Sequence, residues 1–331
     1  MTAPLLEVRN LRTRFTQGGK ELRAVEDVSF SLHAGRTLGL VGESGSGKSV
    51  TGFSIMGLID PPGRIHSGQI LYRGRDLATM SRRELRHLQG NRIAMVFQDP
   101  MMTLNPVLRI GVQMTEAIHA HERVDRATAR ARARDMLAAT GIPSPESRLD
   151  AYPHQLSGGM RQRVAIAIAM LNRPDVIIAD EPTTALDVSI QAQILVEVQQ
   201  LVRQTGMAMI WITHDLSVVA GIADEIAVMY AGRIVERGPV DPVLDAPRHP
   251  YTSGLIASLP GQAPHGARLT QIPGSAPNMY APPPGCAFAP RCVWADDACL
   301  RQPALGEAAP QRVRCFHPLG GPPSAIEEVR P

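Results

Sequence analysis

Hydrophobic and polar residues follow two different periods along the chain, and these periods divide it into strand-like and helix-like stretches. Short apolar or alternating runs, typical of strands, cover residues 5–14, 25–32, 37–41, 69–72, 93–97, 176–180, 207–213, 225–230 and 232–236. Apolar residues at helical spacing cover 50–58, 110–121, 126–140, 157–171 and 189–204. Strands that alternate with helices predict an α/β fold with a largely parallel sheet covered by helices. The series of helices at about 103–173 predicts a helical subdomain.

This pattern is lost near Pro239, where the composition changes. More than half of the 28 prolines lie from there to Pro331, and they include the run Pro282-Pro283-Pro284. Proline interrupts helices and does not fit central strands. We therefore expect a first domain at residues 1–238. It is followed by an irregular extension at 239–331 that is ordered only if a covalent or metal link holds it.

A glycine-rich segment between the strand at 37–41 and the helix at 50–58 fits the phosphate-binding pattern G-x-x-x-x-G-K-[ST]. Its residues are Gly42, Glu43, Ser44, Gly45, Ser46, Gly47, Lys48 and Ser49, and Val50 continues into the helix. Glycines let the backbone curl so that its amides converge on phosphate oxygens, and the start of the helix adds unpaired N–H groups. Lys48 can reach the outer phosphates, and Ser49 can ligate Mg²⁺. The alternative is a glycine-rich turn that matches by accident, and the strand–loop–helix setting argues against it.

Two carboxylates follow the apolar strand at 176–180. Asp180 is its last residue and Glu181 comes directly after it. Ligands of parallel-sheet proteins bind at the carboxyl ends of strands, so these residues are candidates for the same site as the glycine-rich segment. Asp180 suits the support of Mg²⁺, and Glu181 suits the deprotonation of an attacking water.

A second helix start has the features of an anion site. Ser157 is a good N-cap for the helix at 157–171, and Gly158 and Gly159 expose backbone amides behind it. Taken alone, the segment is better explained as a simple helix cap. His214, at the end of the strand at 207–213, has a similar alternative as a partly buried cap.

The bulk composition argues against several classes of protein. A chain of 331 residues with 44% hydrophobic content can bury a sizeable core, whereas a net charge of +3 and 4% aromatic residues argue against a nucleic-acid-binding surface. The first ten residues do not resemble a signal peptide, and no stretch approaches the roughly 18 apolar residues of a membrane span. We expect a soluble, cytoplasmic protein that does not bind nucleic acid.

The order of these motifs resembles that of the ATP-binding-cassette (ABC) ATPases. The motifs are the phosphate loop, Gln98, Leu156–Met160, Ile178–Glu181, Thr184–Asp187 and His214. The resemblance covers about Leu5 to Gly238. It implies a P-loop NTPase fold of the ABC type, with a mixed sheet core, a helical subdomain and ATP held between two such domains.

The resemblance also implies a role for the residues that bind nucleotide and metal. Lys48 and Ser49 would hold phosphate and Mg²⁺, with Asp180 supporting the metal. Gln98 would sense the metal and the attacking water, and would couple the site to a membrane partner. Phe15 would stack on adenine, although many members of the family have tyrosine at this position.

Further roles concern the chemistry and the second subunit. Glu181 would be the general base, and His214 would contact the γ-phosphate and keep Glu181 aligned. Ser157, with the amides of Gly158 and Gly159, would contact ATP held by the other subunit. Asp187 would communicate across the dimer.

Segments of the extension resemble the C-terminal region of oligopeptide and dipeptide importer ATPases. They are His249–Thr252, Ser258–Pro260 and Gly285–Cys292. The implied partners are a second ABC ATPase subunit, identical or homologous, two membrane permease subunits and an extracytoplasmic solute-binding protein. The chain would then be peripheral, at the cytoplasmic face of the inner membrane. Relatives with this extension also handle nickel and other solutes, so an importer for nickel or another small solute is an alternative.

A different class of protein, the soluble cassette ATPases that act on ribosomes or DNA, is a further alternative. Those proteins commonly carry two cassettes in one chain or a long coiled-coil insertion. This chain has one cassette and no heptad run, which favours the transporter interpretation.

All four cysteines lie in the extension, at Cys286, Cys292, Cys299 and Cys315. A reducing cytoplasm disfavours disulfides, and four buried structural thiols fit poorly in a proline-rich segment with little core. Thiolates suit zinc or an iron–sulfur cluster, and the spacing lacks the C-x-x-C pairs of ordinary zinc ribbons. The family resemblance implies a 4Fe–4S cluster, with zinc or no metal as the alternatives.

Overall fold

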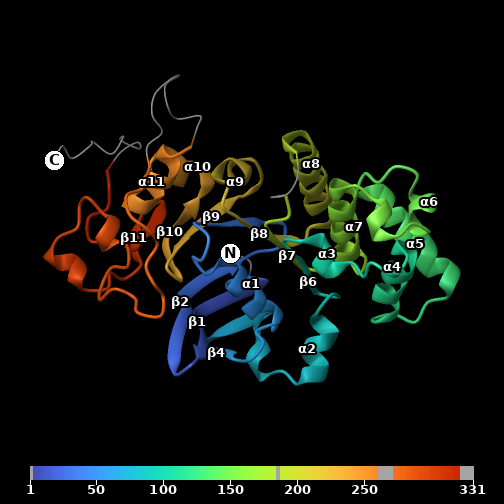
Figure 1. The fold of residues 1–331 in the computed structure, drawn as a ribbon, viewed down its shortest axis with the longest axis horizontal. Helices are drawn as coiled ribbons and strands as arrows, with labels where there is room; N and C mark the ends of the chain where they lie inside the picture. The colour runs from blue at the N-terminus through green and yellow to red at the C-terminus, as the bar shows by residue number, and fades with distance from the viewer. Residues whose placement is uncertain (1–2, 184–186, 260–270, 321–331) are drawn as a thin grey trace.

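The computed structural model describes residues 3–183, 187–259 and 271–320. Two sheets occupy the middle of the molecule, and a block of helices and the C-terminal extension lie at opposite ends of its long axis (Figure 1). The prediction of an α/β fold with a helical subdomain is therefore confirmed.

The larger sheet has eight strands among the described residues, and its centre is parallel. Its order is β11 (Gly306–Ala308), β12 (Gln311–Val313), β10 (Arg233–Pro239), β9 (Glu225–Tyr230), β3 (Thr37–Val41), β8 (Ala208–Thr213), β7 (Val176–Asp180) and β6 (Ile93–Val96). Strands β9, β3, β8, β7 and β6 run parallel, whereas β10, β12 and β11 are joined by antiparallel pairs. The sheet is therefore mixed, with its parallel part next to the predicted phosphate loop.

The smaller sheet is antiparallel and has the order β2 (Lys20–Leu32), β1 (Leu6–Gln17), β4 (Gly63–Tyr72) and β5 (Arg75–Asp76). Gln17 pairs with Lys20 across Gly18 and Gly19, whose φ angles are 57° and 75°. Two successive residues at positive φ match the tight hairpin that suits twisted strands, and glycine adopts this backbone without strain.

Helices cover the larger sheet and form the block at one end. The first group is α1 (Lys48–Met56), α8 (Val188–Thr205) and α9 (Leu216–Ile222), whereas α2 (Arg82–Leu88) has no buried residue and lies next to the end of α1. The block consists of α3 (Pro100–Thr103), α4 (Ile110–His119), α5 (Arg126–Ala139), α6 (Pro145–Leu149) and α7 (Gly158–Met170), and it has a hydrophobic core of its own. The periodicity predicted the long helices to within two residues at each end, but it missed shorter ones, among them α2 and α9, which are seven residues long.

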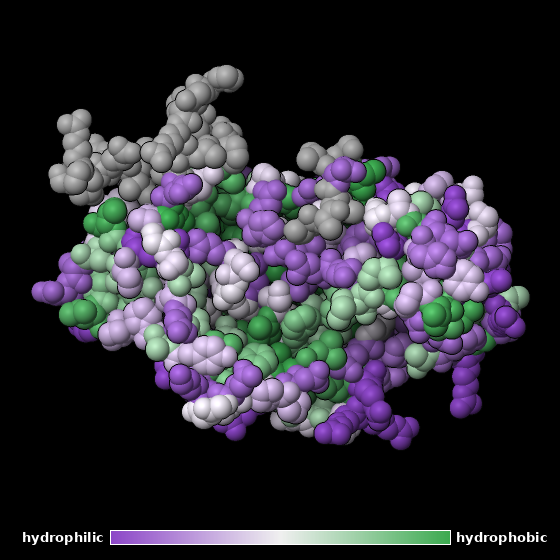
Figure 2. Space-filling model, viewed as in Figure 1, coloured by the Kyte–Doolittle hydropathy of each residue, from purple (hydrophilic) through white to green (hydrophobic). Residues whose placement is uncertain are grey.

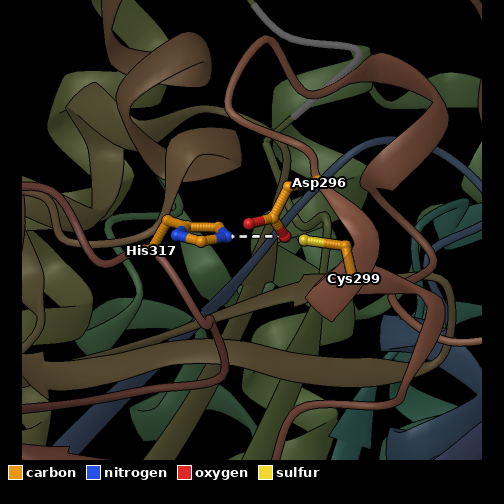
Figure 3. A group of neighbouring side chains, drawn as sticks. All are labelled: Asp296, Cys299 and His317. Atoms are coloured by element: carbon orange, nitrogen blue, oxygen red, sulfur yellow. Dashed lines mark ion pairs between the residues drawn. The ribbon is translucent and has the colours of Figure 1, made fainter.

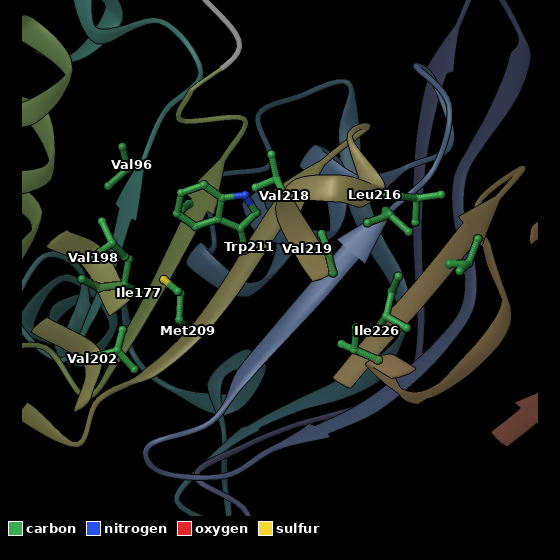
Figure 4. Close-up of a cluster of buried hydrophobic side chains, with 14 of the residues drawn as sticks. Val96, Ile177, Val198, Val202, Met209, Trp211, Leu216, Val218, Val219 and Ile226 are labelled. Atoms are coloured by element: carbon green, nitrogen blue, oxygen red, sulfur yellow. The ribbon is translucent and has the colours of Figure 1, made fainter. Parts of the chain in front are cut away.

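The central strand β8 shows why strands in the middle of the larger sheet are apolar at successive positions. Its side chains alternate between two cores: Met209 and Trp211 belong to one cluster, and Ala208, Ile210 and Ile212 to the other. A strand buried on both faces needs apolar residues at every position. Figure 4 shows Trp211 among valines and other apolar side chains from the neighbouring strands and helices.

The extension differs from the expected irregular appendage. Its helices α10 (Val240–Asp245) and α11 (Pro250–Ala257) are short, as the prolines require, but β12 pairs with β10 and so enlarges the main sheet. Tyr251 and Phe288 belong to the same hydrophobic core as Trp211. The extension is therefore packed on the domain through buried aromatic residues, which a proline count does not reveal.

Hydrophilic and hydrophobic residues are unevenly distributed over the surface of the molecule. Hydrophilic residues dominate the helical end of the face drawn in Figure 2, and hydrophobic residues gather across its middle. Within the described ranges, none of the helices combines the length and the apolar character that crossing a bilayer requires.

Candidate functional site

Four neighbouring parallel strands end along one edge of the larger sheet, and each leads into a predicted site residue. Gly42 follows β3, Glu181 follows β7 and His214 follows β8, while Gln98 lies two residues after β6. The phosphate loop, Gln98, Glu181 and His214 line a single cavity of about 770 Å³. This volume lies within the range of small-molecule sites.

The phosphate loop has the backbone geometry that its glycines were expected to provide. Gly42, Gly45 and Gly47 have φ angles of 152°, 78° and 100°. A Cβ at Gly42 would lie 2.2 Å from the carbonyl oxygen of Met229, and one at Gly47 would lie 2.4 Å from that of Ala24. Glycine is therefore required at these two positions both by the backbone angle and by the close approach of neighbouring strands.

Lys48 lies at the start of α1, with its ammonium group turned back over the loop. Nζ donates to the carbonyl oxygens of Gly42 at 2.7 Å and Glu43 at 3.0 Å. The residue is 5% exposed, and burial lowers its pKa, although the carboxylates of Glu181, Asp180 and Glu43 act in the opposite direction. A buried cation whose only hydrogen bonds in the described residues are to loop carbonyls is suited to an anionic ligand.

Ser49 and Asp180 form the part of the site that suits a divalent cation. The Ser49 hydroxyl donates to Asp180 Oδ1 at 2.9 Å, so the two predicted ligands are already adjacent. Asp180 is 3% exposed, and burial raises its pKa while the bond from Ser49 opposes that shift. A carboxylate and a hydroxyl are oxygen donors of the kind that Mg²⁺ takes beside phosphate oxygens. The residues present therefore fit Mg²⁺.

Glu181 lies between two of the other predicted residues. Its Oε2 accepts a hydrogen bond from Gln98 Nε2 at 3.2 Å and lies 3.4 Å from His214 Nδ1. Its backbone N–H donates to the carbonyl oxygen of Ile212 at 2.9 Å, and its φ is 45°, which is uncommon for a residue with a side chain. A backbone held in this region is typical of functional positions.

The second predicted anion site lies elsewhere in the chain. Ser157 caps α7 by accepting a hydrogen bond from Met160 N at 3.3 Å, as expected for an N-cap. Ser157, Gly158, Gly159 and Asp187 line a separate cavity of about 490 Å³. In the described part of the chain, the phosphate loop and Ser157 therefore do not share a cavity. Three residues of the Thr184–Asp187 motif, 184–186, lie outside the described residues.

The cavity at the phosphate loop also has an apolar side that sequence reasoning missed. Its residues are Leu22, Ala24, Leu255 and Met279, the last two from the extension. The predicted aromatic residue, Phe15, is paired with Leu22 across the hairpin and packs next to Gly63, and it is not among the lining residues. Stacking of Phe15 on adenine stays a prediction. No local pattern marks Leu255 or Met279, because only packing of the extension brings them here.

The four cysteines are gathered in the extension. Burial raises the pKa of the Cys286, Cys292 and Cys315 thiols, to about 11 for Cys315, and neighbouring cysteines raise each of the three further. The backbone N–H of Cys286 donates to the carbonyl oxygen of Cys299 at 2.9 Å. Thiols with these surroundings become thiolates only beside a compensating positive charge.

A histidine and an aspartate that the sequence did not point to lie beside Cys299. His317 Nε2 lies 2.9 Å from Asp296 Oδ1, and both groups approach the sulfur of Cys299 (Figure 3). Among the described residues, this is the only group of three or more histidine, cysteine or acidic donors within 4.8 Å of one another. His317 follows Cys315 by two residues, which is the one signal in the sequence that could have found it.

Comparisons with known proteins cover almost the whole chain. Residues 25–184 match the family described as "ABC transporter", and residues 235–299 match "Oligopeptide/dipeptide transporter, C-terminal region". The dipeptide transport ATP-binding protein DppD of Escherichia coli (strain K12) is 49% identical over 317 residues, which is 95% of this chain and 97% of DppD. The oligopeptide transport ATP-binding protein OppD of Bacillus subtilis (strain 168) is 51% identical over 293 residues, 88% of this chain and 82% of OppD.

Solved structures agree in fold. The dimeric structure of MJ0796, described as a bacterial ABC transporter cassette, has a TM-score of 0.64 at 26% identity and covers 71% of this chain and 98% of MJ0796. A second structure of the same cassette, in a post-hydrolysis state bound to ADP and Pi, gives the same TM-score of 0.64.

The phosphate loop offers a matched pair of substitutions. Gly47→Ala and Gly45→Ala both place a side chain at positive φ, which costs about 1–2 kcal/mol. Only Gly47→Ala also brings its Cβ against the backbone of β2, since nothing lies within 4 Å of a Cβ at Gly45. We expect Gly47→Ala to weaken ATP binding by more than about tenfold and Gly45→Ala to weaken it less. Calorimetric titration, with thermal unfolding as the control for folding, measures both, and equal losses would contradict the steric argument.

Proposed function

The chain belongs to the ABC transporter family, and we propose that within this family it is the ATP-hydrolysing subunit of an importer for dipeptides or oligopeptides. The observation that carries the proposal is the cavity in which the phosphate loop meets Gln98, Glu181 and His214. The names of the relatives and the match of the C-terminal region support peptides as the transported solute.

The residues of the cavity divide the work of hydrolysis. Lys48 and the loop amides bind and orient the phosphates of ATP, and Ser49 and Asp180 would hold Mg²⁺, which when bound neutralises phosphate charge. Glu181 accepts a proton from the attacking water as general base. Gln98 and His214 both contact Oε2 of Glu181 and so fix the orientation of its carboxylate.

The general base has a direct test. Glu181→Gln keeps the shape of the side chain but cannot accept a proton, so ATP should still bind while kcat falls ~10²–10⁴-fold. Glu7→Gln, which alters a carboxylate of β1 outside the cavity, is the matched control and should keep the wild-type rate. The measurement is phosphate release by the assembled transporter. A wild-type rate for Glu181→Gln would show that another group is the base.

A complete site requires two cassettes in this proposal. The phosphate loop and Ser157 line different cavities of one chain, about 770 and 490 Å³ in volume. Two cassettes facing each other would bring the loop of one chain to Ser157 and the Gly158 and Gly159 amides of the other. The dimeric form of the solved MJ0796 cassettes supports this arrangement. The second cassette is an identical or homologous ATPase subunit.

The dimer proposal predicts that the isolated chain hydrolyses ATP poorly and gains activity when a second cassette and its membrane subunits are added. Ser157→Arg should lower phosphate release by the assembled complex at least about tenfold, because a bulky cation replaces the helix cap at the ATP contact. Ser147→Arg, on the exposed surface of the same helical block, is the matched control. Robust hydrolysis by a verified monomer, unaffected by Ser157→Arg, would contradict the proposal.

We further propose that Cys286, Cys292, Cys299 and Cys315 hold an iron–sulfur cluster of the 4Fe–4S type. Two features support it: the buried thiols have raised pKa values that a positive metal centre would offset, and no three of the four sulfurs lie within 4.8 Å of one another. Four thiolates on one zinc at 2.3 Å must lie less than about 4 Å apart. A 4Fe–4S cluster does not need its sulfurs this close to one another, and its role would be to link the segments of the extension.

The group of Asp296, Cys299 and His317 is the competing site, because its donor atoms are close enough for a single zinc ion. Cys299 belongs to both sets, so the two sites exclude each other. A cluster on the four cysteines would leave Asp296 and His317 as an ion pair at its border.

Metal analysis distinguishes the two sites. Anaerobically purified protein should be brown and contain iron and acid-labile sulfide in constant ratio to protein. Cys292→Ser should lose the iron, and His317→Ala should keep it. Zinc without sulfide, lost in His317→Ala and kept in Cys292→Ser, would assign the site to Asp296, Cys299 and His317 instead. Metal-free protein with a protease-resistant extension would refute both sites.

The remaining partners follow from the proposed function. Two membrane permease subunits would convert closure and reopening of the cassettes into transport, and an extracytoplasmic binding protein would deliver the peptide. The chain itself would lie at the cytoplasmic face of the inner membrane as a peripheral subunit.

A further inference from the structure

The C-terminal extension reaches the phosphate loop through Arg291. Its guanidinium group donates to both carboxylate oxygens of Glu43, from Nη1 to Oε2 at 2.8 Å and from Nη2 to Oε1 at 3.0 Å. Two parallel bonds between a guanidinium and a carboxylate fix orientation as well as distance. Glu43 directly follows Gly42 in the phosphate loop, 248 positions before Arg291.

A second residue of the extension holds the backbone of the same glutamate. The hydroxyl oxygen of Tyr251 accepts a hydrogen bond from the Glu43 N–H at 2.9 Å. The Glu43 carbonyl oxygen accepts from Lys48 Nζ at 3.0 Å and from Ser46 N at 3.2 Å. The N–H, the carbonyl and the carboxylate of Glu43 are thus all engaged, two of the three by the extension.

Arg291 is itself fixed in place. Its side chain is 6% exposed, and its guanidinium carbon lies 5.7 Å from the ring centre of Tyr230 and 5.9 Å from that of Phe288. Nε donates to the Pro273 carbonyl oxygen at 2.8 Å, and Nη1 also donates to the Tyr230 hydroxyl at 3.3 Å. The pKa of Arg291 is raised by its bond to Glu43, so the group stays charged. Its position is therefore set before any nucleotide arrives.

The extension also contributes surface to the cavity. Leu255 of α11 and Met279 line it together with the phosphate loop, and the Met279 carbonyl oxygen accepts from Arg23 N of β2 at 3.3 Å. The contact of the extension with the nucleotide site is therefore broader than one ion pair.

We propose that Arg291, with Tyr251, is a positioning residue that holds Glu43 and thereby keeps the phosphate loop in the conformation that binds ATP. A loop with three glycines at positive φ has many alternative conformations, and ordering it at the moment of binding costs affinity. Because the extension orders the loop before ATP binds, binding does not have to supply this ordering free energy. Arg291 also neutralises a carboxylate next to the phosphate site. This inference rests on the proposed ATPase function and adds that the extension sets the affinity for nucleotide.

The test compares two arginines of the extension, each paired with a glutamate. Arg291→Gln should weaken ATP binding by about tenfold, because it leaves the Glu43 carboxylate unpaired beside the phosphates and frees the loop. Arg312→Gln removes the exposed pair with Glu307 on β11 and β12, away from the cavity, and should leave affinity unchanged. The Kd for Mg-ATP is measured by calorimetric titration of the full chain. The assembled transporter should show the loss in KM, with kcat changed less than about twofold.

A rescue separates positioning from general loss of structure. Adding Glu43→Gln to Arg291→Gln removes the unpaired charge and should recover part of the affinity, which a merely unstable extension would not allow. If Arg291→Gln does not fold, Tyr251→Phe, which keeps the ring and removes the acceptor of the Glu43 N–H, should still weaken binding several-fold. Wild-type Kd values in the folded Arg291 and Tyr251 variants would overturn the inference. Failure of the wild-type chain to bind Mg-ATP would instead overturn the proposed function.

Discussion

The site depends on one constraint, which is that four neighbouring parallel strands end at the same edge of a sheet. In the register of the sheet, Val41 of β3 lies opposite Thr213 of β8, and Asp180 of β7 lies opposite Ile212. The residues that follow these positions therefore emerge at one level. Parallel pairing brings the phosphate loop together with Glu181 and His214, which follow it by more than 100 residues of chain, and fixes all three on rigid strands.

Burial shifts the pKa values of the charged groups of the site. Lys48 and Asp180 are both almost fully buried, and burial moves the pKa of each toward the neutral form. Burial removes the hydration of these charged groups, which costs free energy. The hydrogen bonds to the loop carbonyls and from the Ser49 hydroxyl offset this cost only in part. Phosphate oxygens and a divalent cation would supply the missing charges. Lys48 lines the cavity and Asp180 is bonded to Ser49 at its border, and perturbed groups of opposite sign this close together suit a site for a metal–nucleotide complex.

The extension shows how a segment poor in regular structure can still be part of a core. Tyr251 and Phe288 pack with Tyr230 of β9, with ring centres 4.5 to 5.5 Å apart. His249, at the start of α11, is buried among them, and burial lowers its pKa to about 3. Aromatic rings bury a large apolar area each, so a few of them dock a proline-rich segment that has no amphipathic helix. The same docking places Arg291 at Glu43.

The sequence by itself determined the features that are local in the chain. Strand and helix periods predicted the parallel sheet and the helical block, and the contiguous segment from Gly42 to Ser49 identified the phosphate loop, because its function depends on backbone angles of successive residues. Motif order then indicated Gln98, Glu181 and His214 as its companions. Only the tertiary structure decided that the extension joins the sheet, that Leu255 and Met279 line the cavity, and that Arg291 holds Glu43. These contacts join residues far apart in the chain, 77 positions for Glu236 and Val313 and 248 for Glu43 and Arg291, and the extension lacks a regular periodicity. Packing against an already folded surface creates them, and no spacing along the chain encodes such a surface.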